Sequence, residues 1–309
     1  MNIAEIEESF ACKSPRPCFK PVLITDTNRM SRTTKRRLIH APNTAMSSLH
    51  TCLIKELRPY THQKMPSACG GVKGGSVVQT LLRHKNRDGT FKRYLYALDL
   101  KNAYSQVCMP KLAEILYSNI SRELFLSAQT AEKFLKKYCM REPTPGLVIG
   151  GGSSPDLFNI YCEYMIDQAL RRKCDAFDIT YTRYIDDLLF SSDHPIGKKK
   201  RQALRSLIVE SGFIVEDRKS HVYDLSKNPV AINGITLHLY GTMSIPGPYL
   251  RKIQGVIHRA KHFNDVDLQK IQGMVNMIRQ VAHGRRTNAT ERKILDAFCS
   301  LKDNVMSFS

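Results

Sequence analysis

The stretch "YTRYIDDLLFSS", residues 181–192, decides how this chain folds. Apolar, aromatic and β-branched residues on both sides of Asp186 and Asp187 predict two strands joined by a tight turn. Two adjacent carboxylates repel each other, and their burial is costly unless another group pairs with them. A lone Asp-Asp pair at a turn more often serves the turn than catalysis, so the rest of the chain must decide between the two roles.

The charge balance predicts a polyanionic partner. The 309 residues include 47 Lys and Arg but only 28 Asp and Glu, a net charge of +19. A protein this basic usually faces nucleic acid, because neutralised phosphates release counterions. The alternative is a basic surface without a specific partner. The length of 309 residues is enough for one large domain or two to three subdomains, and the hydrophobic content of 42% is ordinary for a globular protein.

The cysteines and the apolar runs indicate a cytoplasmic protein. Nine cysteines occur without a Cys-x-x-Cys pair, a pattern that favours neither a zinc knuckle nor a disulfide framework. No apolar run reaches the length of roughly 18–20 residues that spans a bilayer, so no membrane partner is expected. The N-terminus "MNIAEIEESF" lacks the basic and apolar regions of a secretory signal.

A third aspartate is expected to join the pair. "RYLYALDL", residues 93–100, predicts a strand ending at Asp99. A glycine turn and a helix over 147–170 follow, with Ser153 or Ser154 as N-cap and Pro155 at the first helical position. If the strands pair antiparallel, the three carboxylates meet at one sheet edge. Mg²⁺ prefers such oxygen ligands, and two ions about 4 Å apart can promote phosphoryl transfer.

Periodicity outlines the remaining elements. Residues 1–36 are interpreted as an extended arm without periodicity. Residues 68–76 are expected to form a glycine-rich loop, and the composition changes near Pro246–Pro248. Helices are predicted at 45–58, from about 105 to 140, at about 197–211 and, three of them, from Tyr249 onward, with a hairpin-like segment at 230–246.

Four segments resemble, in order, the palm motifs of reverse transcriptases: "ALDLKNAY" (97–104), "IGGGSSPDLFN" (149–159), "YIDD" (184–187) and "GFIVEDRKS" (212–220). Beyond these four motifs, bacterial retron-type and group II intron-like enzymes have segments similar to "RLIHAPN" (37–43), "GGVKGGSV" (70–77), "VAINGITL" (230–237) and "SIPGPYLRKIQGVIHRAKH" (244–262). The resemblance covers about residues 35–305. It implies an α+β right-hand polymerase, whose expected parts are an N-terminal arm (1–36), fingers (37–92), a palm with an antiparallel sheet (93–246, with a helical fingers insertion at about 105–145) and a helical thumb (247–309).

The resemblance also implies site residues. Asp99, Asp186 and the carbonyl of Leu100 would bind two Mg²⁺ ions, with Mn²⁺ as an alternative, and Asp187 would support them as a catalytic and metal-site residue. Lys219 would protonate the leaving pyrophosphate, although a lone lysine is normally only a surface residue.

Further residues would bind the substrates. Arg37, together with Lys35, would contact the triphosphate, as basic residues do in phosphoryl transfer; either could instead belong to a merely basic loop. Tyr104 falls at the position of the steric gate against ribonucleotides, and a core aromatic is the alternative. Gly150, Ser154 and Pro155 would shape the floor under the template base.

Some positions depart from the family pattern. Ile149 stands where the box Leu-Pro-Gln-Gly-x-x-Ser-Pro has glutamine. An aliphatic residue at this position resembles the error-prone enzymes of diversity-generating retroelements, so we hypothesise lowered fidelity or altered template preference. The retron box Asn-Ala-x-x-His is absent, and "ING" replaces "VTG". Retron-like, antiphage and unassigned bacterial reverse transcriptases therefore stay open.

The predicted function is RNA-directed DNA synthesis from dNTPs on an RNA template with a nucleic-acid primer. A cognate structured RNA and an accessory protein are further candidate partners. The basic thumb (Arg251, Lys252, Arg259, Lys261) would follow duplex phosphates. No segment after about residue 305 would supply a nuclease domain. Two alternatives are an untemplated nucleotidyl transferase of an antiphage system and a catalytically idle RNA-binding protein of the same fold.

Overall fold

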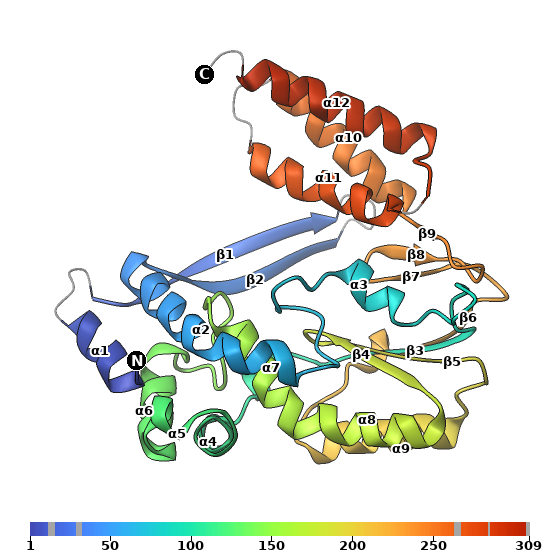
Figure 1. The fold of residues 1–309 in the computed structure, drawn as a ribbon. Coiled ribbons are helices and arrows are strands. Elements are labelled where there is room, and N and C mark those ends of the chain that lie inside the picture. The colour runs from blue at the N-terminus through green and yellow to red at the C-terminus, as the bar shows by residue number, and fades with distance from the viewer. Residues whose placement is uncertain (12–15, 29–32, 263–266, 284, 307–309) are drawn as a thin grey trace. The chain divides into compact units, whose positions relative to one another are not determined.

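A computed structural model describes residues 1–11, 16–28, 33–262, 267–283 and 285–306 (Figure 1). Within these ranges, the side chains of 26–28, 33–35, 62–64, 262 and 304–306 lie outside the description. The chain divides into a first unit, Met1–Ser76 with Tyr96–Val222, and a second unit, Val77–Leu95 with Tyr223–Ser309. The predicted boundary near Pro246–Pro248 falls inside the second unit. The division into arm, fingers, palm and thumb stays a prediction.

A four-stranded sheet in the order β4-β5-β3-β6 positions the aspartates. Its strands are β3 (Tyr94–Asp99), β4 (Thr180–Tyr184), β5 (Asp187–Ser192) and β6 (His221–Asp224). β4 and β5 pair antiparallel, with Tyr184 opposite Asp187. The predicted strand–turn–strand and the strand ending at Asp99 are therefore confirmed, and β3 lies directly beside β5.

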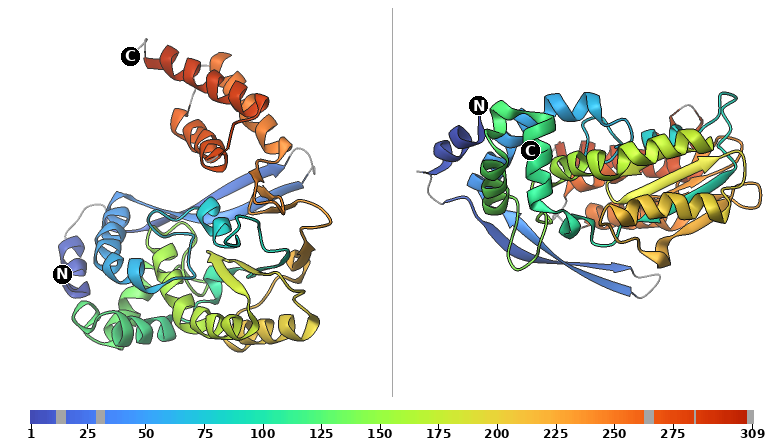
Figure 2. Two further views of the ribbon diagram at one scale, coloured as in Figure 1. Left: turned by 45° about the vertical axis from the view of Figure 1, so that its right-hand side comes forward. Right: turned by 90° about the horizontal axis from the view of Figure 1, so that it is seen from below.

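Helices α8 (Gln168–Phe177) and α9 (Lys198–Glu210) run side by side along one face of this sheet (Figures 1 and 2). α8 continues from α7 (Ser154–Cys162) through a π-helical turn, Glu163–Asp167. The helices predicted over 147–170 and 197–211 are confirmed in type. Ser153 is the N-cap of α7, but its side chain makes no capping hydrogen bond.

The helical pattern predicted from about 105 to 140 is broken into several pieces. Ser121 and Ser127 each cap a new helix, accepting hydrogen bonds from the amides of Leu124 and Thr130. Leu126, between these two serines, has a positive φ of 59° and ends the first of the two helices. The pieces are a 3₁₀ turn (Ala103–Gln106), α4 (Met109–Ile115), a π-helical turn (Leu116–Ile120), α5 (Arg122–Phe125) and α6 (Ala128–Tyr138).

The N-terminal segment differs from the predicted extended arm. Residues Ile3–Ala11 form helix α1, which buries Ile3, Ile6 and Phe10 on one face. The spacing of these three residues is helical, so the signal was present but short. A two-stranded antiparallel ribbon follows, β1 (Phe19–Asn28) with β2 (Thr33–Pro42), and then α2 (Thr44–Lys64).

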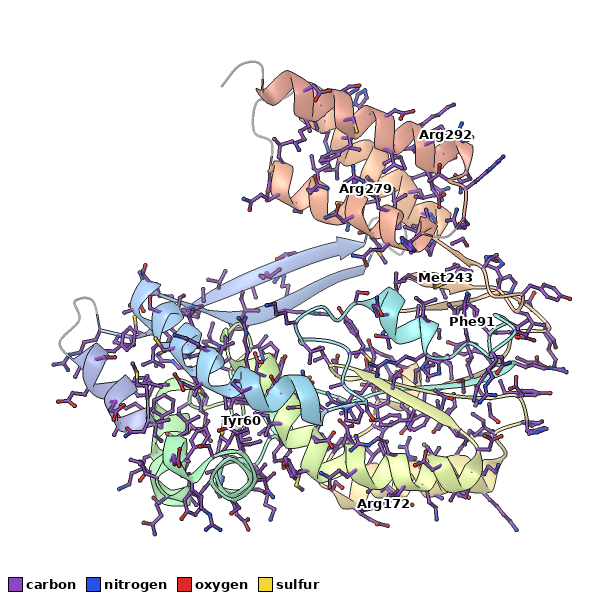
Figure 3. All side chains as sticks on the ribbon, in the orientation of Figure 1. Tyr60, Phe91, Arg172, Met243, Arg279 and Arg292 are labelled. Atoms are coloured by element: carbon purple, nitrogen blue, oxygen red, sulfur yellow. The ribbon has the colours of Figure 1, made fainter. Side chains whose placement is uncertain are left out.

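The second unit confirms the hairpin-like segment and the three C-terminal helices. Its elements are α3 (Val77–Leu82), β7 (Val230–Ile232), β8 (Ile235–Leu237), β9 (Met243–Ser244), α10 (Gly247–His262), α11 (Leu268–Ala282) and α12 (Ala289–Met306). The helices bury Ile253, Val275 and Phe298. Figure 3 labels the exposed side chains of Arg279 on α11 and Arg292 on α12.

Two further expectations concern the cysteines and the membrane. Eight cysteines are free thiols in the described part of the chain, and Cys12 lies outside it. Across the described ranges, no helix has the length and apolar character that a membrane crossing requires.

Candidate active site

The turn between β4 and β5 carries two of the three predicted aspartates. Because Tyr184 pairs with Asp187, Ile185 and Asp186 form the two-residue loop. Ile185 has a positive φ of 57°, a conformation that is rare for a β-branched residue. Such backbone strain persists only where the surroundings enforce it, and it is concentrated at functional sites.

Asp99 reaches the same place from the end of β3. The amide of Leu100, the next residue, donates a hydrogen bond of 3.0 Å to the carbonyl of Asp186. On the other side, the carbonyl of Asp99 accepts a hydrogen bond of 2.8 Å from the amide of Glu216. Backbone bonds on both flanks therefore fix the end of β3 beside the turn.

The three carboxylates influence one another electrostatically. Burial raises the pKa of Asp187 to about 7, and the negative charges of Asp186 and Asp99 and a hydrogen bond to Asp99 contribute to this shift. Burial also raises the pKa of Asp186, with a further contribution from Asp99. These acids are held close together at a cost in free energy, as expected for a site that is completed by a cation.

Lys219 supplies one positive charge to this group. Its Nζ lies 2.6 Å from Oδ2 of Asp99. This hydrogen bond raises the pKa of the Lys219 ammonium. The lysine side chain is 56% exposed while that of Asp99 is 13% exposed, so the ammonium reaches the carboxylate from the solvent side.

The donor set suits a hard divalent cation that brings other ligands with it. Within the described ranges, no three His, Cys, Asp or Glu side chains are grouped closely enough to enclose a metal ion. Mg²⁺ usually takes only one or two carboxylates and completes its shell with waters and substrate phosphates. Neighbouring carboxylates with raised pKa values fit such an open site, because a bound cation would offset their repulsion.

Strand β2 brings Arg37 toward the aspartates. The residue is exposed and pairs with Ile24 across the ribbon. Its positive charge opposes the rise in the pKa of Asp186, although burial is the dominant effect. Lys35 lies on the same strand, but its side chain is outside the part of the chain whose side chains are described.

Tyr104 lies in the 3₁₀ turn directly after β3, and its ring packs edge-on against Phe158 with centroids 5.1 Å apart. Burial raises the pKa of its hydroxyl, and the nearby charge of Asp186 acts in the same direction. Tyr104 is therefore both a packed aromatic residue and a neighbour of the aspartates.

The loop before α7 lies against strand β2. The amide of His40 donates a hydrogen bond of 2.8 Å to the carbonyl of Ile149, whose side chain is exposed. Gly150 has a φ of 104°, and a Cβ there would lie 2.7 Å from the carbonyl oxygen of His40. Glycine is therefore required at this position both by the backbone conformation and by the close approach of β2.

Ser154 and Pro155 contribute to the structure of this loop. The buried hydroxyl of Ser154 donates a hydrogen bond of 2.7 Å to the carbonyl of Val148, and the Pro155 ring would lie 2.9 Å from a Cβ on Gly71. The missing N-cap bond also has a cause here. Both the amide and the hydroxyl of Ser153 lie within hydrogen-bond reach of Nδ1 of His50.

Sequence reasoning missed the polar residues beneath the turn. Arg183 and Asp167 are fully buried and form an ion pair with a closest approach of 2.7 Å. Arg183 directly precedes the Tyr-Ile-Asp-Asp segment, so a charged residue in an otherwise uncharged strand was the available signal. The buried His50 gave no comparable signal, because its partners Ser153 and Tyr138 are remote in sequence.

Comparison with known proteins agrees with this geometry. The pattern of the family described as "Reverse transcriptase (RNA-dependent DNA polymerase)" matches residues 24–237, more than half of the chain. The Retron Ec83 reverse transcriptase of Escherichia coli is 24% identical over 255 residues, which cover 79% of this chain and 78% of that protein. The Retron Mx65 reverse transcriptase of Myxococcus xanthus is 24% identical over 245 residues, covering 76% of this chain and 55% of that protein.

Solved structures agree on the fold. Apo telomerase from Candida tropicalis superposes with a TM-score of 0.55 at 13% sequence identity, covering 99% of this chain and 61% of that one. Telomerase from Candida albicans in complex with a fragment of telomeric RNA gives 0.53 at 10% identity, covering 92% of this chain and 59% of that one. This chain thus spans about three fifths of each telomerase chain. The predicted right-hand polymerase fold is confirmed, and the chain, which is similar to retron reverse transcriptases, belongs to the reverse transcriptase family of RNA-dependent DNA polymerases.

Proposed function

We propose that this chain copies an RNA template into DNA by nucleotidyl transfer at Asp99, Asp186 and Asp187. The observation that carries the proposal is the backbone hydrogen bond of 3.0 Å from the amide of Leu100 to the carbonyl of Asp186, which joins the end of β3, where Asp99 lies, to the turn that carries Asp186 and Asp187. The raised pKa of Asp187, to which burial and the charges of Asp186 and Asp99 contribute, agrees with this proximity. Neighbouring acids at the end of a strand and an adjoining turn suit a reaction in which cations and phosphates meet.

Asp99, Asp186 and the carbonyl of Leu100 would hold the divalent metal, with Asp187 in support. Mg²⁺ is the proposed ion, and Mn²⁺ is an alternative with similar ligand preferences. When bound, the metal would neutralise negative charge on the phosphate oxygens and on the attacking oxygen. The residues of the chain would fix the position of these ligands through the backbone bonds on both sides of Asp99.

Lys219 and Arg37 would serve the triphosphate. Lys219 would donate a proton to the leaving pyrophosphate, and its hydrogen bond of 2.6 Å to Asp99 supports this role. Arg37, with Lys35 as its neighbour on β2, would contact the phosphates. Basic groups that face developing charge stabilise the transition state of phosphoryl transfer.

The remaining predicted residues would select the substrates. Tyr104, beside Asp186 and packed on Phe158, would exclude the 2′-hydroxyl of a ribonucleotide. The loop from Ile149 to Pro155 would support the template base. An RNA template and a nucleic-acid primer are the proposed partners, and a structured RNA and an accessory protein are further ones to test.

Primer extension with and without an RNA template tests the proposal. The purified protein is given a primer, dNTPs and Mg²⁺, and the products are sequenced. DNA that copies the template is the expected result. Tailing of the primer without template would indicate an untemplated transferase, and retained RNA binding without product would indicate an idle RNA-binding protein.

A further inference from the structure

The turn that carries Asp186 needs an external support. Ile185 holds a left-handed conformation, φ 57°, that its branched side chain disfavours. A two-residue hairpin loop usually obtains such a conformation from glycine, asparagine or aspartate. Ile185 relies instead on its surroundings, so the residues that contact it determine where Asp186 and Asp187 lie.

The first support is a glycine shelf made by Gly70 and Gly71. A Cβ on Gly70 would lie 2.9 Å from the Ile185 amide nitrogen, and a Cβ on Gly71 would lie 2.8 Å from Cδ1 of Ile185. The absence of side chains at these glycines is what lets the loop over residues 68–76 close onto the turn. The same loop also pairs with β4, because the amide of Cys69 donates to the carbonyl of Arg183 at 2.8 Å.

The second support is the guanidinium of Arg183, which is fully buried beneath the turn. Its Nη1 donates a hydrogen bond of 2.9 Å to the carbonyl of Ile185 and another of 2.9 Å to Oδ1 of Asn159. Its Nε and Nη2 pair with the carboxylate of Asp167, at 3.0 Å and 2.7 Å. A planar fork can satisfy these partners together, whereas a single ammonium cannot.

The partners of Arg183 connect it to the neighbouring segments. Asn159, on α7, donates a hydrogen bond of 2.9 Å from Nδ2 to the carbonyl of Gly70 on the shelf. Asp167 also accepts a hydrogen bond of 2.7 Å from the hydroxyl of Tyr181. Among the described residues, no buried side-chain nitrogen or oxygen lacks a partner. The network is therefore complete, and it joins α7, β4, the glycine shelf and the turn.

We propose that Arg183 is a positioning residue for catalysis. By its bond to the Ile185 carbonyl, and through Asn159 to the shelf, it holds the turn so that Asp186 and Asp187 face Asp99. It does not touch the substrates. This inference rests on the proposed function, because it assigns Arg183 a role in the reaction that the aspartates perform.

Arg183→Lys tests this role, with Arg171→Lys as the matched control. Arg171 also pairs with a buried carboxylate, Glu163, and also contacts the 67–71 segment through Ser67, but no described hydrogen bond joins it to the turn. For Arg183→Lys we expect kcat for templated synthesis to fall about 30-fold or more, with the KM for dNTP changed less than about threefold. For Arg171→Lys, kcat should stay within about twofold. Melting temperatures establish that both variants are folded.

A double-variant cycle separates positioning from general structure. Glycine tolerates the left-handed conformation, so in an Ile185→Gly background the effect of Arg183→Lys on kcat should shrink to a few-fold. If Arg183→Lys does not fold, Asn159→Ala takes its place, with an expected fall in kcat of about tenfold and little change in KM.

Three outcomes would overturn the role of Arg183. The first is an equal fall in kcat for Arg183→Lys and Arg171→Lys. The second is a fall in kcat by Arg183→Lys that is as large in the Ile185→Gly background as in the wild type. The third, where Asn159→Ala is the test, is an unchanged kcat. If the inference about Arg183 fails while the wild-type protein copies the template, the proposed function still stands. If the wild-type protein makes no templated DNA, both the proposed function and the role of Arg183 are contradicted.

Discussion

At the scale of single residues, Asp187 is a largely buried carboxyl group whose ionisation opposes folding. Burial and the neighbouring aspartates raise its pKa from 3.8 to about 7. A carboxyl group whose pKa is raised in the folded state favours folding when protonated and opposes it when ionised. Its stabilising contribution is therefore complete below about pH 4, and it is lost as the pH rises toward and past 7.

Asp187→Asn is expected to remove this pH dependence. In the presence of EDTA at pH 8, the free energy of unfolding of the variant should exceed that of the wild type by about 2 kcal/mol. This is roughly half of the value that about 1.4 kcal/mol per pKa unit would give, because solvent screens a partly exposed carboxyl group. Such a difference corresponds to several degrees in melting temperature. At pH 4 the two proteins should melt together.

Thermal melts monitored by circular dichroism at pH 4, 6 and 8 provide the measurement. Addition of Mg²⁺ at pH 8 should raise the melting temperature of the wild type more than that of Asp187→Asn. Parallel curves over the whole pH range would show that Asp187 does not have the raised pKa described here.

Tyr104 provides a second prediction at this scale. If its ring excludes the 2′-hydroxyl, Tyr104→Ala should raise ribonucleotide incorporation relative to deoxynucleotide incorporation by about 10- to 100-fold. Tyr104→Phe keeps the ring on Phe158 and should leave the ratio near that of the wild type. Single-nucleotide insertion kinetics with dNTP and rNTP measure this ratio, and an unchanged ratio in Tyr104→Ala would leave the ring with a packing role alone.

At the scale of elements, the contact between β2 and the loop before α7 brings two candidate substrate-binding segments together. The hydrogen bond from His40 to Ile149 and the close approach at Gly150 keep the loop against the strand that carries Arg37. The exposed side chain of Ile149 lies at this junction. An altered residue there is expected to act on the template base through the loop.

Ile149→Gln is predicted to lower misincorporation by about threefold or more, since the amide can form hydrogen bonds that the isoleucine cannot. Ile149→Leu is the matched control, because it keeps the apolar character and the size. Sequencing of DNA products made on a defined RNA template gives the error rate. Equal error rates for the wild type and Ile149→Gln would end the hypothesis that Ile149 lowers fidelity.

The elements that could be predicted from sequence are those with a strong local pattern. The β4–β5 hairpin follows from two apolar runs around Asp186 and Asp187, and the C-terminal helices follow from long apolar stripes. The ribbon β1–β2 was not predicted. Val22, Leu23 and Ile24 are three consecutive apolar residues, all exposed, so the sequence lacks the alternation of apolar and polar residues that indicates a strand. Helix α1 escaped because its pattern is only nine residues long.

Within the site, Asp99, Asp186 and Asp187 could be found because each stands at the edge of a strand pattern. The support beneath them could not be found in this way. The burial of Arg183 is tolerated because Asp167 neutralises its charge, and because Asn159 and the carbonyl of Ile185 accept its other hydrogen bonds. Such pairings depend on the way α7, its π-helical turn and β4 pack, which a linear pattern does not contain.

At the scale of the whole molecule, exposed basic side chains contribute to the net charge of +19. Arg251, Lys252, Arg259 and Lys261 are all exposed on α10, the first helix of the predicted thumb. Arg172, which Figure 3 labels, and its neighbour Lys173 are exposed on α8. An excess of positive charge that is spread in this way is expected to make nucleic-acid binding strongly dependent on salt.

Arg251→Gln and Lys252→Gln are each predicted to weaken template–primer binding and to reduce the slope of log Kd against log salt by about 0.7–0.9. The double variant should lose about twice that amount. Lys133→Gln, which removes an exposed charge from α6, is the control and should leave the slope unchanged. Filter binding between 50 and 200 mM salt gives the slopes, and equal slopes in all variants would remove α10 from the duplex interface.

The most direct test of catalysis by the three aspartates is single-turnover extension of a primed RNA template by the wild type and by Asp186→Asn. The substitution preserves the size of the side chain and removes its charge. We predict templated DNA from the wild type and a rate lower by about 10³-fold or more in a variant with an unchanged fold. Template-copied DNA made by Asp186→Asn at the wild-type rate would contradict the assignment of the active site.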